Sequence, residues 1–216
     1  MTLKNRTALV TGSTQGIGLA IAQALAQEGA NIVLHGIEEA GQGEAISADL
    51  ATRFGVQAAY IRANLAKAEE AEQLVAVASQ ALDAPDILVN NAGIQYTCGI
   101  ESFPAERWDA ILAAKHGLVG LSKGVALETA TQGIAVNCIC PGWTDTAIIQ
   151  PQIELRAAKF GGDRDAGIRD LLSEKQPNQT LLAPQRIGEI VAFLCSESAA
   201  GITGVALPVD GGWTAQ

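Results

Sequence analysis

The segment TALVTGSTQGIG, residues 7–18, sets the architecture that we expect for the whole chain. Its first four residues form a short apolar run typical of a buried strand, and three glycines follow within the next eight residues. Ile17–Gln27 then has the apolar spacing of a helix. A glycine-rich turn between a strand and a helix lets the backbone approach a pyrophosphate, which binds to the N–H groups and the positive dipole end of the helix. The segment therefore predicts a dinucleotide site, with a plain turn as the alternative.

The rest of the chain repeats this alternation of strand and helix. Further strands are predicted at Asn31–Leu34, Ala58–Ile61, Ile87–Val89, Ile134–Ile139 and Val205–Val209, with helices near residues 45–50, 68–82, 103–131 and 187–194. The alternation indicates right-handed βαβ units, and hence an α/β fold with a doubly wound parallel sheet of the Rossmann type. Residues 151–180 are charged and are predicted to be loop-like. We therefore expect residues 1–216 to form a single dinucleotide-binding domain, with residues 147–182 inserted as a substrate loop or lid.

Composition and charge restrict the class of protein. The chain has 216 residues, of which 48% are hydrophobic and 4% aromatic, so we expect an aliphatic core, as in parallel sheets covered by helices. A net charge of −9, without any basic run, argues against a nucleic-acid partner. The amino terminus has only a short apolar run, which predicts no signal peptide and no membrane span, and indicates a cytoplasmic protein. The four cysteines form no CxxC pair and are expected to be free thiols rather than metal ligands.

Four motifs carry a resemblance to a known family. They are, in chain order, TGSTQGIG at residues 11–18, NNAG at residues 90–93, PGW at residues 141–143 and DGG at residues 210–212. With them the chain resembles the short-chain dehydrogenase/reductase family, and NNAGIQ, AKHGLVGLSK and VDGGWTA are similar to its bacterial (R)-3-hydroxybutyrate dehydrogenases. The resemblance implies a nicotinamide cofactor, a small hydroxy or keto acid as substrate, and a homo-oligomer, which in the family is a tetramer.

The same resemblance assigns roles to individual residues. The cofactor-binding residues would be Gly12, Ser13, Ile17 and Gly18 at the pyrophosphate, with Thr14 and Ile37 as further contacts, Asn64 and Leu65 at the adenine, Asn91, Ala92, Gly93 and Lys115 on the nicotinamide ribose side, and Pro141, Gly142, Trp143 and Thr146 at the carboxamide. Gln95, Gln176 and Trp213 would hold the carboxylated substrate. For the two glutamines the alternative is an ordinary exposed amide, and for the tryptophan an anchor in the core or an interface.

The sequence favours NAD over NADP as the cofactor. Glu38 and Glu39 lie about 20 positions beyond the glycine turn, where an acidic residue accepts hydrogen bonds from the ribose of NAD. No arginine or lysine in the glycine turn or at the end of the second strand is available for a 2′-phosphate. The alternative is that the two glutamates only stabilise the start of a helix.

Lys115 lacks the partner that the resemblance implies. The family uses an asparagine, a serine, and a tyrosine and lysine spaced as YxxxK, in which the ammonium lowers the pKa of the phenol so that it can accept the alcohol proton. Lys115 is the catalytic residue of this set that remains, and Ile111 occupies the tyrosine position. The resemblance implies that about forty residues of the family's pattern, more than one βαβ unit, are missing between FPAERWDAILA and AKHGLVGLSKG. We therefore expect a sheet one strand short of the family's seven.

Three interpretations remain open. The chain is a 3-hydroxybutyrate-type dehydrogenase with impaired catalysis, or a non-catalytic protein that binds NAD(H) or serves as a subunit partner, or a sequence that lacks a segment of the working enzyme. Tyr96 is the aromatic hydroxyl nearest to the predicted cofactor site and the one candidate to replace the missing tyrosine. His116 is expected to point away from Lys115, because neighbours on a helix diverge by about 100°.

Overall fold

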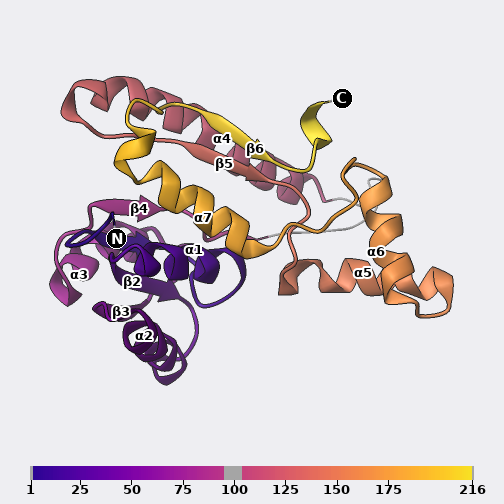
Figure 1. Ribbon diagram of the computed structural model, residues 1–216, viewed down its shortest axis with the longest axis horizontal. Coiled ribbons are helices and arrows are strands. Elements are labelled where there is room, and N and C mark those ends of the chain that lie inside the picture. Colours follow the sequence, from indigo (N-terminus) through magenta and orange to yellow (C-terminus); the bar gives the residue numbers. More distant parts are fainter. Residues whose placement is uncertain (1, 95–103, 216) are drawn as a thin grey trace. The chain divides into compact units, whose positions relative to one another are not determined.

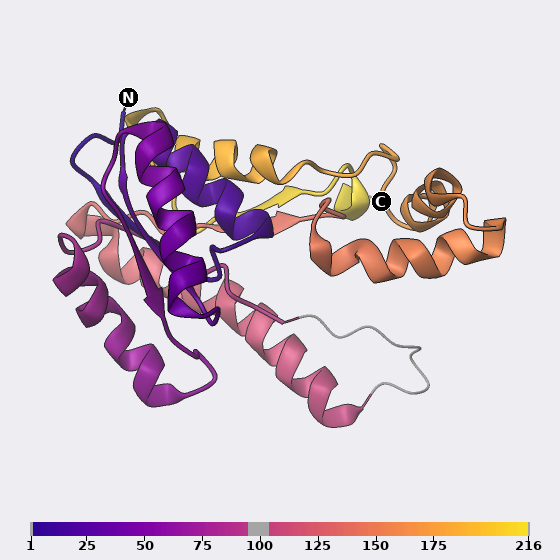
Figure 2. The same ribbon diagram turned by 90° about the horizontal axis from the view of Figure 1, so that it is seen from below.

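A computed structural model describes residues 2–94 and 104–215, with the backbone alone for residues 105–112 (Figures 1 and 2). The strands are β1 (Thr7–Val10), β2 (Asn31–Gly36), β3 (Ala58–Arg62), β4 (Ile87–Val89), β5 (Cys138–Pro141) and β6 (Ala206–Val209). The α-helices are α1 (Gly16–Gln27), α2 (Ala40–Phe54), α3 (Ala68–Ala81), α4 (Ala105–Thr129), α5 (Gln150–Ala157), α6 (Arg164–Ser173) and α7 (Pro184–Leu194). Short 3-10 turns are η2 (Ala130–Gln132), η3 (Ala147–Ile149), η4 (Ala158–Phe160), η5 (Glu197–Ala199) and η6 (Trp213–Ala215).

The chain divides into two compact units. The first contains Met1–Gly93, Thr144–Ala147 and Ala183–Ala199, and the second contains Ile94–Trp143, Ile148–Leu182 and Ala200–Gln216. The first unit thus holds β1 to β4 with α1, α2, α3 and α7, and the second holds α4, α5, α6, β5 and β6.

A four-stranded parallel sheet in the order β3-β2-β1-β4 forms the centre of the first unit. All four residues of β1 are buried, because this strand has a neighbour on each side and helices over the sheet. Helix α1 buries Ile21 and Leu25 and packs beside α7 (Figure 1), where Gly188 permits a close approach to the backbone of Ala20. Leu74 of α3 joins apolar residues of the sheet in an aliphatic core.

In the second unit, β5 and β6 form a separate two-stranded parallel sheet. Helix α4 runs without interruption across the junction between the two helical segments of the sequence (Figure 2). The thiol of Cys138 in β5 donates a hydrogen bond to the hydroxyl of Ser122 in α4 at 3.2 Å. Since the described residues place no strand beside β4 except β1, β4 is an edge strand, and Leu88 within it is 52% exposed.

The start of β5 differs from the sequence prediction. The predicted strand Ile134–Ile139 begins four residues too early, because the ladder with β6 starts where Cys138 pairs with Ala206. Before that point the chain is held by a side chain, since the N–H of Val136 donates to the hydroxyl of Thr203 at 3.0 Å.

The prediction of a loop over residues 151–180 is also wrong, because α5 and α6 occupy most of this segment and lie side by side (Figure 1). Ile153 and Leu171 are buried in one apolar cluster between them. The guanidinium of Arg156 pairs with the carboxylates of Asp170 at 3.0 Å and Glu174 at 2.6 Å. Charged residues of this segment therefore link two packed helices rather than lying in a loop.

Cys138, Cys140 and Cys195 are half-buried free thiols, and Cys98 lies outside the described residues. Burial raises the pKa of the thiols of Cys140 and Cys195, which makes them poor nucleophiles near neutral pH. Within the part of the chain that the structure describes, no helix combines the length and apolar character needed to cross a bilayer.

Candidate functional site

The carboxyl end of β1 turns sharply into α1. Gly12 and Gly16 have φ angles of +59° and +57°, a left-handed conformation that glycine adopts without strain. A Cβ atom at Gly12 would lie 2.9 Å from the Cα atom of Ala92, so the segment after β4 packs directly against the turn. A Cβ atom at Gly18 would overlap the carbonyl oxygen of Gly12. The closed shape of the turn therefore requires glycine at these positions.

The first turn of α1 is suited to bind an anion. Gln15, at the N-cap, makes no side-chain hydrogen bond to this turn, and the first turn contains no acidic residue. The N–H groups at a helix start and the positive end of the helix dipole attract phosphate. Ile17, in this turn, is half-buried, so its backbone rather than its side chain offers the polar contact.

Asn91 fastens the segment after β4 to the glycine turn. Its side-chain nitrogen donates to the carbonyl oxygens of Thr11 and Gly12, at 2.9 and 3.0 Å. The hydroxyl of Thr11 accepts hydrogen bonds from the N–H groups of Asn91 and Ala92, both at 2.9 Å, and donates to Val89 at 3.2 Å. Thr11 was not among the predicted site residues, although its hydroxyl group, immediately before Gly12, was a usable signal.

Replacement of Asn91 by alanine is expected to lower the free energy of unfolding by about 2–3 kcal/mol, because two hydrogen bonds are lost and two partly buried carbonyl groups lose a donor. Chemical denaturation followed by circular dichroism measures this change. Gln57→Ala, at an exposed amide, is the control and should alter stability by less than about 0.5 kcal/mol. Equal effects of the two variants would contradict the role of Asn91.

An acidic side chain folds back onto the turn from the segment after β2. The hydroxyl of Thr14 donates to Oε1 of Glu38 at 2.7 Å, and the hydroxyl of Tyr60 donates to the backbone carbonyl of Glu38 at 2.8 Å. The other carboxylate oxygen of Glu38, Oε2, is buried and has no hydrogen-bond partner among the described residues. Since a buried carboxylate oxygen without a donor is unfavourable, this atom suits a hydroxyl group of a ligand. Glu39, by contrast, is exposed and pairs with Arg62 at 3.1 Å.

Two buried side chains support the turn from below. The hydroxyl of Ser13 donates to the carbonyl of Val10 at 2.7 Å and accepts from the backbone N–H of His35 at 3.0 Å. The backbone N–H of Ser13 donates to the backbone carbonyl of His35 at 2.9 Å. The ring of His35 contacts Gly12 through Nδ1 at 3.1 Å and Ala63 through Nε2 at 3.0 Å. The hydroxyl and the backbone N–H of Ser13 thus bond to other groups of the protein, and Ser13 contributes to the site by shaping the turn. The contact made by His35 was not predicted.

Of the remaining predicted residues of the first unit, some are exposed and others contact neighbouring residues. Ile37 is 67% exposed. The N–H of Asn64 donates to the carboxylate of Glu70 at 2.6 Å, and Leu65 packs on the aliphatic core. Thr146 is the nearest neighbour of a Cβ atom built at Gly16, at 3.5 Å. Exposed residues of the predicted set also include Ala92 and Gly93.

Three predicted residues come together in the second unit. The side chain of Gln176 is buried, its Oε1 accepts from the N–H of Trp143 at 2.8 Å, and its Nε2 donates to the carbonyl of Thr180. The rings of Trp143 and Trp213 lie 5.9 Å apart, and the ammonium group of Lys175 lies 5.2 Å from the centre of the Trp213 ring. Burial of Gln176 excludes the alternative of an exposed amide. The indole N–H of Trp143 is buried and has no partner among the described residues.

Other predicted residues of the second unit lie at the end of β5 and in α4. Pro141 is exposed, and a Cβ atom at Gly142 would lie 2.7 Å from Oε1 of Gln176, so glycine is required there. Lys115 is exposed in α4, one helical turn after Ile111. Gln95 and Tyr96 lie outside the described residues.

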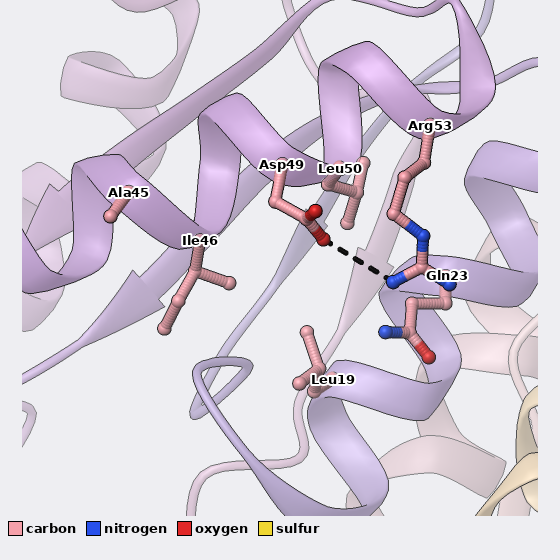
Figure 3. A pocket seen from close by; sticks show the side chains of 7 residues that line it. All are labelled: Leu19, Gln23, Ala45, Ile46, Asp49, Leu50 and Arg53. Atoms are coloured by element: carbon pink, nitrogen blue, oxygen red, sulfur yellow. Dashed lines mark hydrogen bonds and ion pairs between the residues drawn. The ribbon is translucent and has the colours of Figure 1, made fainter.

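A cavity of about 380 Å³ lies between α1 and α2 (Figure 3). Its rim carries the ion pair of Arg53 and Asp49, at 3.2 Å. It is lined by Leu19, Gln23, Ala45, Ile46, Asp49, Leu50 and Arg53, none of which is a predicted cofactor or substrate residue. Among the described residues, no group of three or more histidine, cysteine, aspartate or glutamate side chains is arranged to hold a metal ion.

Two family models together match nearly all of the chain. The model for short chain dehydrogenase matches residues 6–113, and the model for enoyl-(acyl carrier protein) reductase matches residues 94–214. The chain therefore belongs to the short-chain dehydrogenase family.

Within that family the chain is similar to D-beta-hydroxybutyrate dehydrogenase from Cupriavidus necator, with 40% identity over 260 residues, 99% of this chain and 100% of the relative. It is also 33% identical to the protein of that name from Rhizobium meliloti, over 98% of this chain and 99% of the relative. The first alignment has 260 positions whereas the chain has 216 residues, so at least 44 positions have no residue of this chain.

Solved structures confirm the predicted fold class. L-sorbose reductase from Gluconobacter frateurii, in complex with NADPH and L-sorbose, matches with a TM-score of 0.89 and 27% identity over 100% of both chains. A dehydrogenase/reductase from Sinorhizobium meliloti matches with a TM-score of 0.81 and 30% identity, over 98% of this chain and 96% of its own. The fold is α/β with a Rossmann-type parallel sheet, shortened here to a four-stranded sheet and a separate pair of strands.

Proposed function

We propose that this chain binds NAD(H) at the glycine turn and belongs to the 3-hydroxybutyrate dehydrogenase branch of its family, with its own turnover impaired. The proposal depends on two features that lie together: the first turn of α1, which has no side-chain cap, and the carboxylate oxygen Oε2 of Glu38, which has no hydrogen-bond partner among the described residues. Gly12, Ile17 and Gly18 would hold the pyrophosphate at this turn.

The choice of NAD over NADP rests on Glu38. Its carboxylate already binds the hydroxyl of Thr14 in the turn, and the oxygen Oε2, which meets no donor within the described part of the chain, suits a ribose hydroxyl. A 2′-phosphate brought to the same position would meet a negative charge, which disfavours NADP. The positive charge of Arg62, the neighbouring cation, is paired with Glu39.

Glu38→Gln is expected to lower the ratio of the dissociation constants for NADPH and NADH by about tenfold, because the amide keeps an acceptor for Thr14 but removes the charge. Calorimetric titrations with both cofactors measure the ratio. Glu72→Gln, at an exposed glutamate of α3, is the control with the same change of charge and should leave the ratio within about twofold. An unchanged ratio in Glu38→Gln would remove Glu38 from the selection of the cofactor.

For the substrate we propose a short hydroxy or keto acid such as 3-hydroxybutyrate. The names of the two relatives support this class, and so does the cluster of Trp143, Gln176 and Trp213, with Lys175 as a nearby cation for a carboxylate. Gln95 would complete the substrate set. The buried amide of Gln176 makes two hydrogen bonds inside the unit, so its role would be to position Trp143. Residues 147–182 would then act as a lid built from α5 and α6.

Impaired turnover is proposed because Lys115 has Ile111 at the position of its tyrosine partner. When bound, the nicotinamide supplies the hydride transfer, but the protein must also move a proton from the alcohol. Neither the isoleucine side chain nor an ammonium group can replace a phenolate in that step. The alignment with at least 44 unmatched positions supports the absence of the segment that carries this tyrosine and the serine in the family.

Because isoleucine rather than tyrosine stands at position 111, there is one further candidate function. The chain would bind NAD(H) without turnover and act as a subunit partner. Both candidates share the cofactor site. We also propose that the chain acts in the cytoplasm as a homo-oligomer.

Calorimetric titration of the purified chain with NADH and NADPH at pH 8 tests the shared part of the proposal. We expect saturable binding of one NADH per chain and weaker binding of NADPH. A flat NADH titration would overturn both candidate functions.

A further inference from the structure

His35 lies at the end of β2, directly beneath the glycine turn, and is 2% exposed. The N–H of Gly12 donates to its Nδ1 atom at 3.1 Å, and its Nε2 atom lies 3.0 Å from the carbonyl oxygen of Ala63. The ring thus joins the turn to the segment that follows β3. No ligand contact is needed to explain either bond.

The two partners fix the protonation state of the ring. Because the partner of Nδ1 is a donor, Nδ1 must carry a lone pair, and because the partner of Nε2 is a carbonyl oxygen, Nε2 must carry the hydrogen. A protonated imidazole would point an N–H group of Nδ1 at the N–H group of Gly12 and lose that bond. The observed arrangement therefore exists only with neutral imidazole.

We propose that His35 is a positioning residue that keeps the glycine turn in its phosphate-binding shape while its ring is neutral, so that protonation of the ring weakens cofactor binding. The inference rests on the proposed cofactor site. It adds a pH dependence to that site, from a residue that does not touch the cofactor.

The turn is tightly coupled to His35. Besides the ring contact with Gly12, the backbone of His35 exchanges two hydrogen bonds with Ser13, at 2.9 and 3.0 Å. Gly12 has little room to move, since a Cβ atom there would already lie 2.9 Å from the Cα atom of Ala92. Loss of the ring contact therefore acts on the residues that shape the turn.

Charged groups around the ring do not cancel this effect. The carboxylate of Glu38 favours the protonated ring, and so does the carbonyl of Ala63, but burial outweighs both and lowers the pKa of His35 below its ordinary value. Gly12 and Ser13, which contact His35 from the glycine turn, bring only uncharged groups. Arg62, from β3, is directed to Glu39 and to the carbonyl of Ile37.

The sign of the pH effect follows from the lowered pKa. Well above about pH 6.5, the ordinary pKa of histidine, the ring is neutral in both the folded and the unfolded chain, so its contribution to stability is constant. As the pH falls below that value, the unfolded chain takes up a proton that the folded chain resists, and stability decreases. Cofactor affinity should fall over the lower part of the same range, when the folded ring finally binds its proton.

The test compares NADH binding from pH 8 to pH 5 in the wild type and in His35→Asn, whose side-chain oxygen can accept the Gly12 hydrogen bond and does not titrate. We expect the dissociation constant of the wild type to rise about tenfold more across this range than that of His35→Asn. His116→Gln, which removes the chain's other histidine, is the control and should follow the wild type. Equal pH profiles for the wild type and His35→Asn would overturn the inference.

A second measurement is independent of cofactor binding. Nitrogen NMR of the ring in the protein without cofactor should show His35 with hydrogen on Nε2 and a titration below that of a free histidine. A ring protonated on Nδ1, or one that titrates normally in the folded chain, would contradict the inference even if NADH binds. If NADH does not bind at pH 8, the proposed function fails, while the ring measurement still decides the role of His35.

Discussion

Gly18→Ala is expected to weaken NADH binding by at least about 100-fold. The added Cβ atom would overlap the carbonyl oxygen of Gly12 and lie 2.5 Å from the side-chain nitrogen of Asn91. Neither the carbonyl of Gly12 nor the side chain of Asn91 can move without losing hydrogen bonds, because Asn91 donates to the carbonyls of Thr11 and Gly12. The turn must therefore open, and the N–H groups at the start of α1 lose their common direction.

Gly41→Ala provides the matched control for this variant. Gly41 also lies in the first half of a helix, α2, but a Cβ atom there meets nothing within 4 Å. We expect NADH binding to be unchanged and the free energy of unfolding to rise by up to about 1 kcal/mol, because alanine is the better helix former. Calorimetry measures NADH binding, and denaturation measures stability, for both variants. Normal NADH binding by Gly18→Ala would show that the turn is not the phosphate site.

The second large effect concerns turnover. The chain is expected to oxidise (R)-3-hydroxybutyrate with NAD at least about 100-fold more slowly than the D-beta-hydroxybutyrate dehydrogenase of Cupriavidus necator measured beside it. A positioned proton acceptor contributes about 10²- to 10⁴-fold to such a rate, and at the predicted position the chain has Ile111. Binding of NADH should be affected far less, since the glycine turn does not depend on this group.

The measurement requires a sample whose intact mass agrees with 22.3 kDa, so that no longer form contributes activity. The appearance of NADH absorbance then reports turnover for both proteins under the same conditions. Equal rates would contradict the predicted impairment and would require another proton acceptor, for which Tyr96 is the first candidate to replace by phenylalanine.

Local patterns were enough to predict much of the fold. The apolar run of β1, the glycines after it and the helix that follows lie within one continuous segment, and the structure has β1 at Thr7–Val10 and α1 at Gly16–Gln27. The sequence predictions were wrong where long-range contacts determine the secondary structure. The start of β5 depends on its pairing with Ala206, and the charged segment after Pro151 becomes helical because Ile153 and Leu171 bury one another.

The candidate site, too, could be predicted from the sequence only in its local part. A glycine motif predicts a turn that approaches phosphate, because its requirements are local. The supports of that turn come from other strands, His35 from β2 and Asn91 from the segment after β4, and their contacts depend on the order of strands in the sheet. Only the folded chain also reveals that Oε2 of Glu38 is buried, with no donor among the residues that the structure describes.

Amide NMR of the labelled chain during titration with NADH tests the central claim most directly. Binding of the pyrophosphate at the glycine turn predicts saturable shifts of the amide signals of Gly16, Ile17 and Gly18, while that of Arg53, beside the cavity between α1 and α2, stays in place. Saturation that moves Arg53 and leaves the three amides of α1 unchanged would place the cofactor elsewhere and contradict the proposed site.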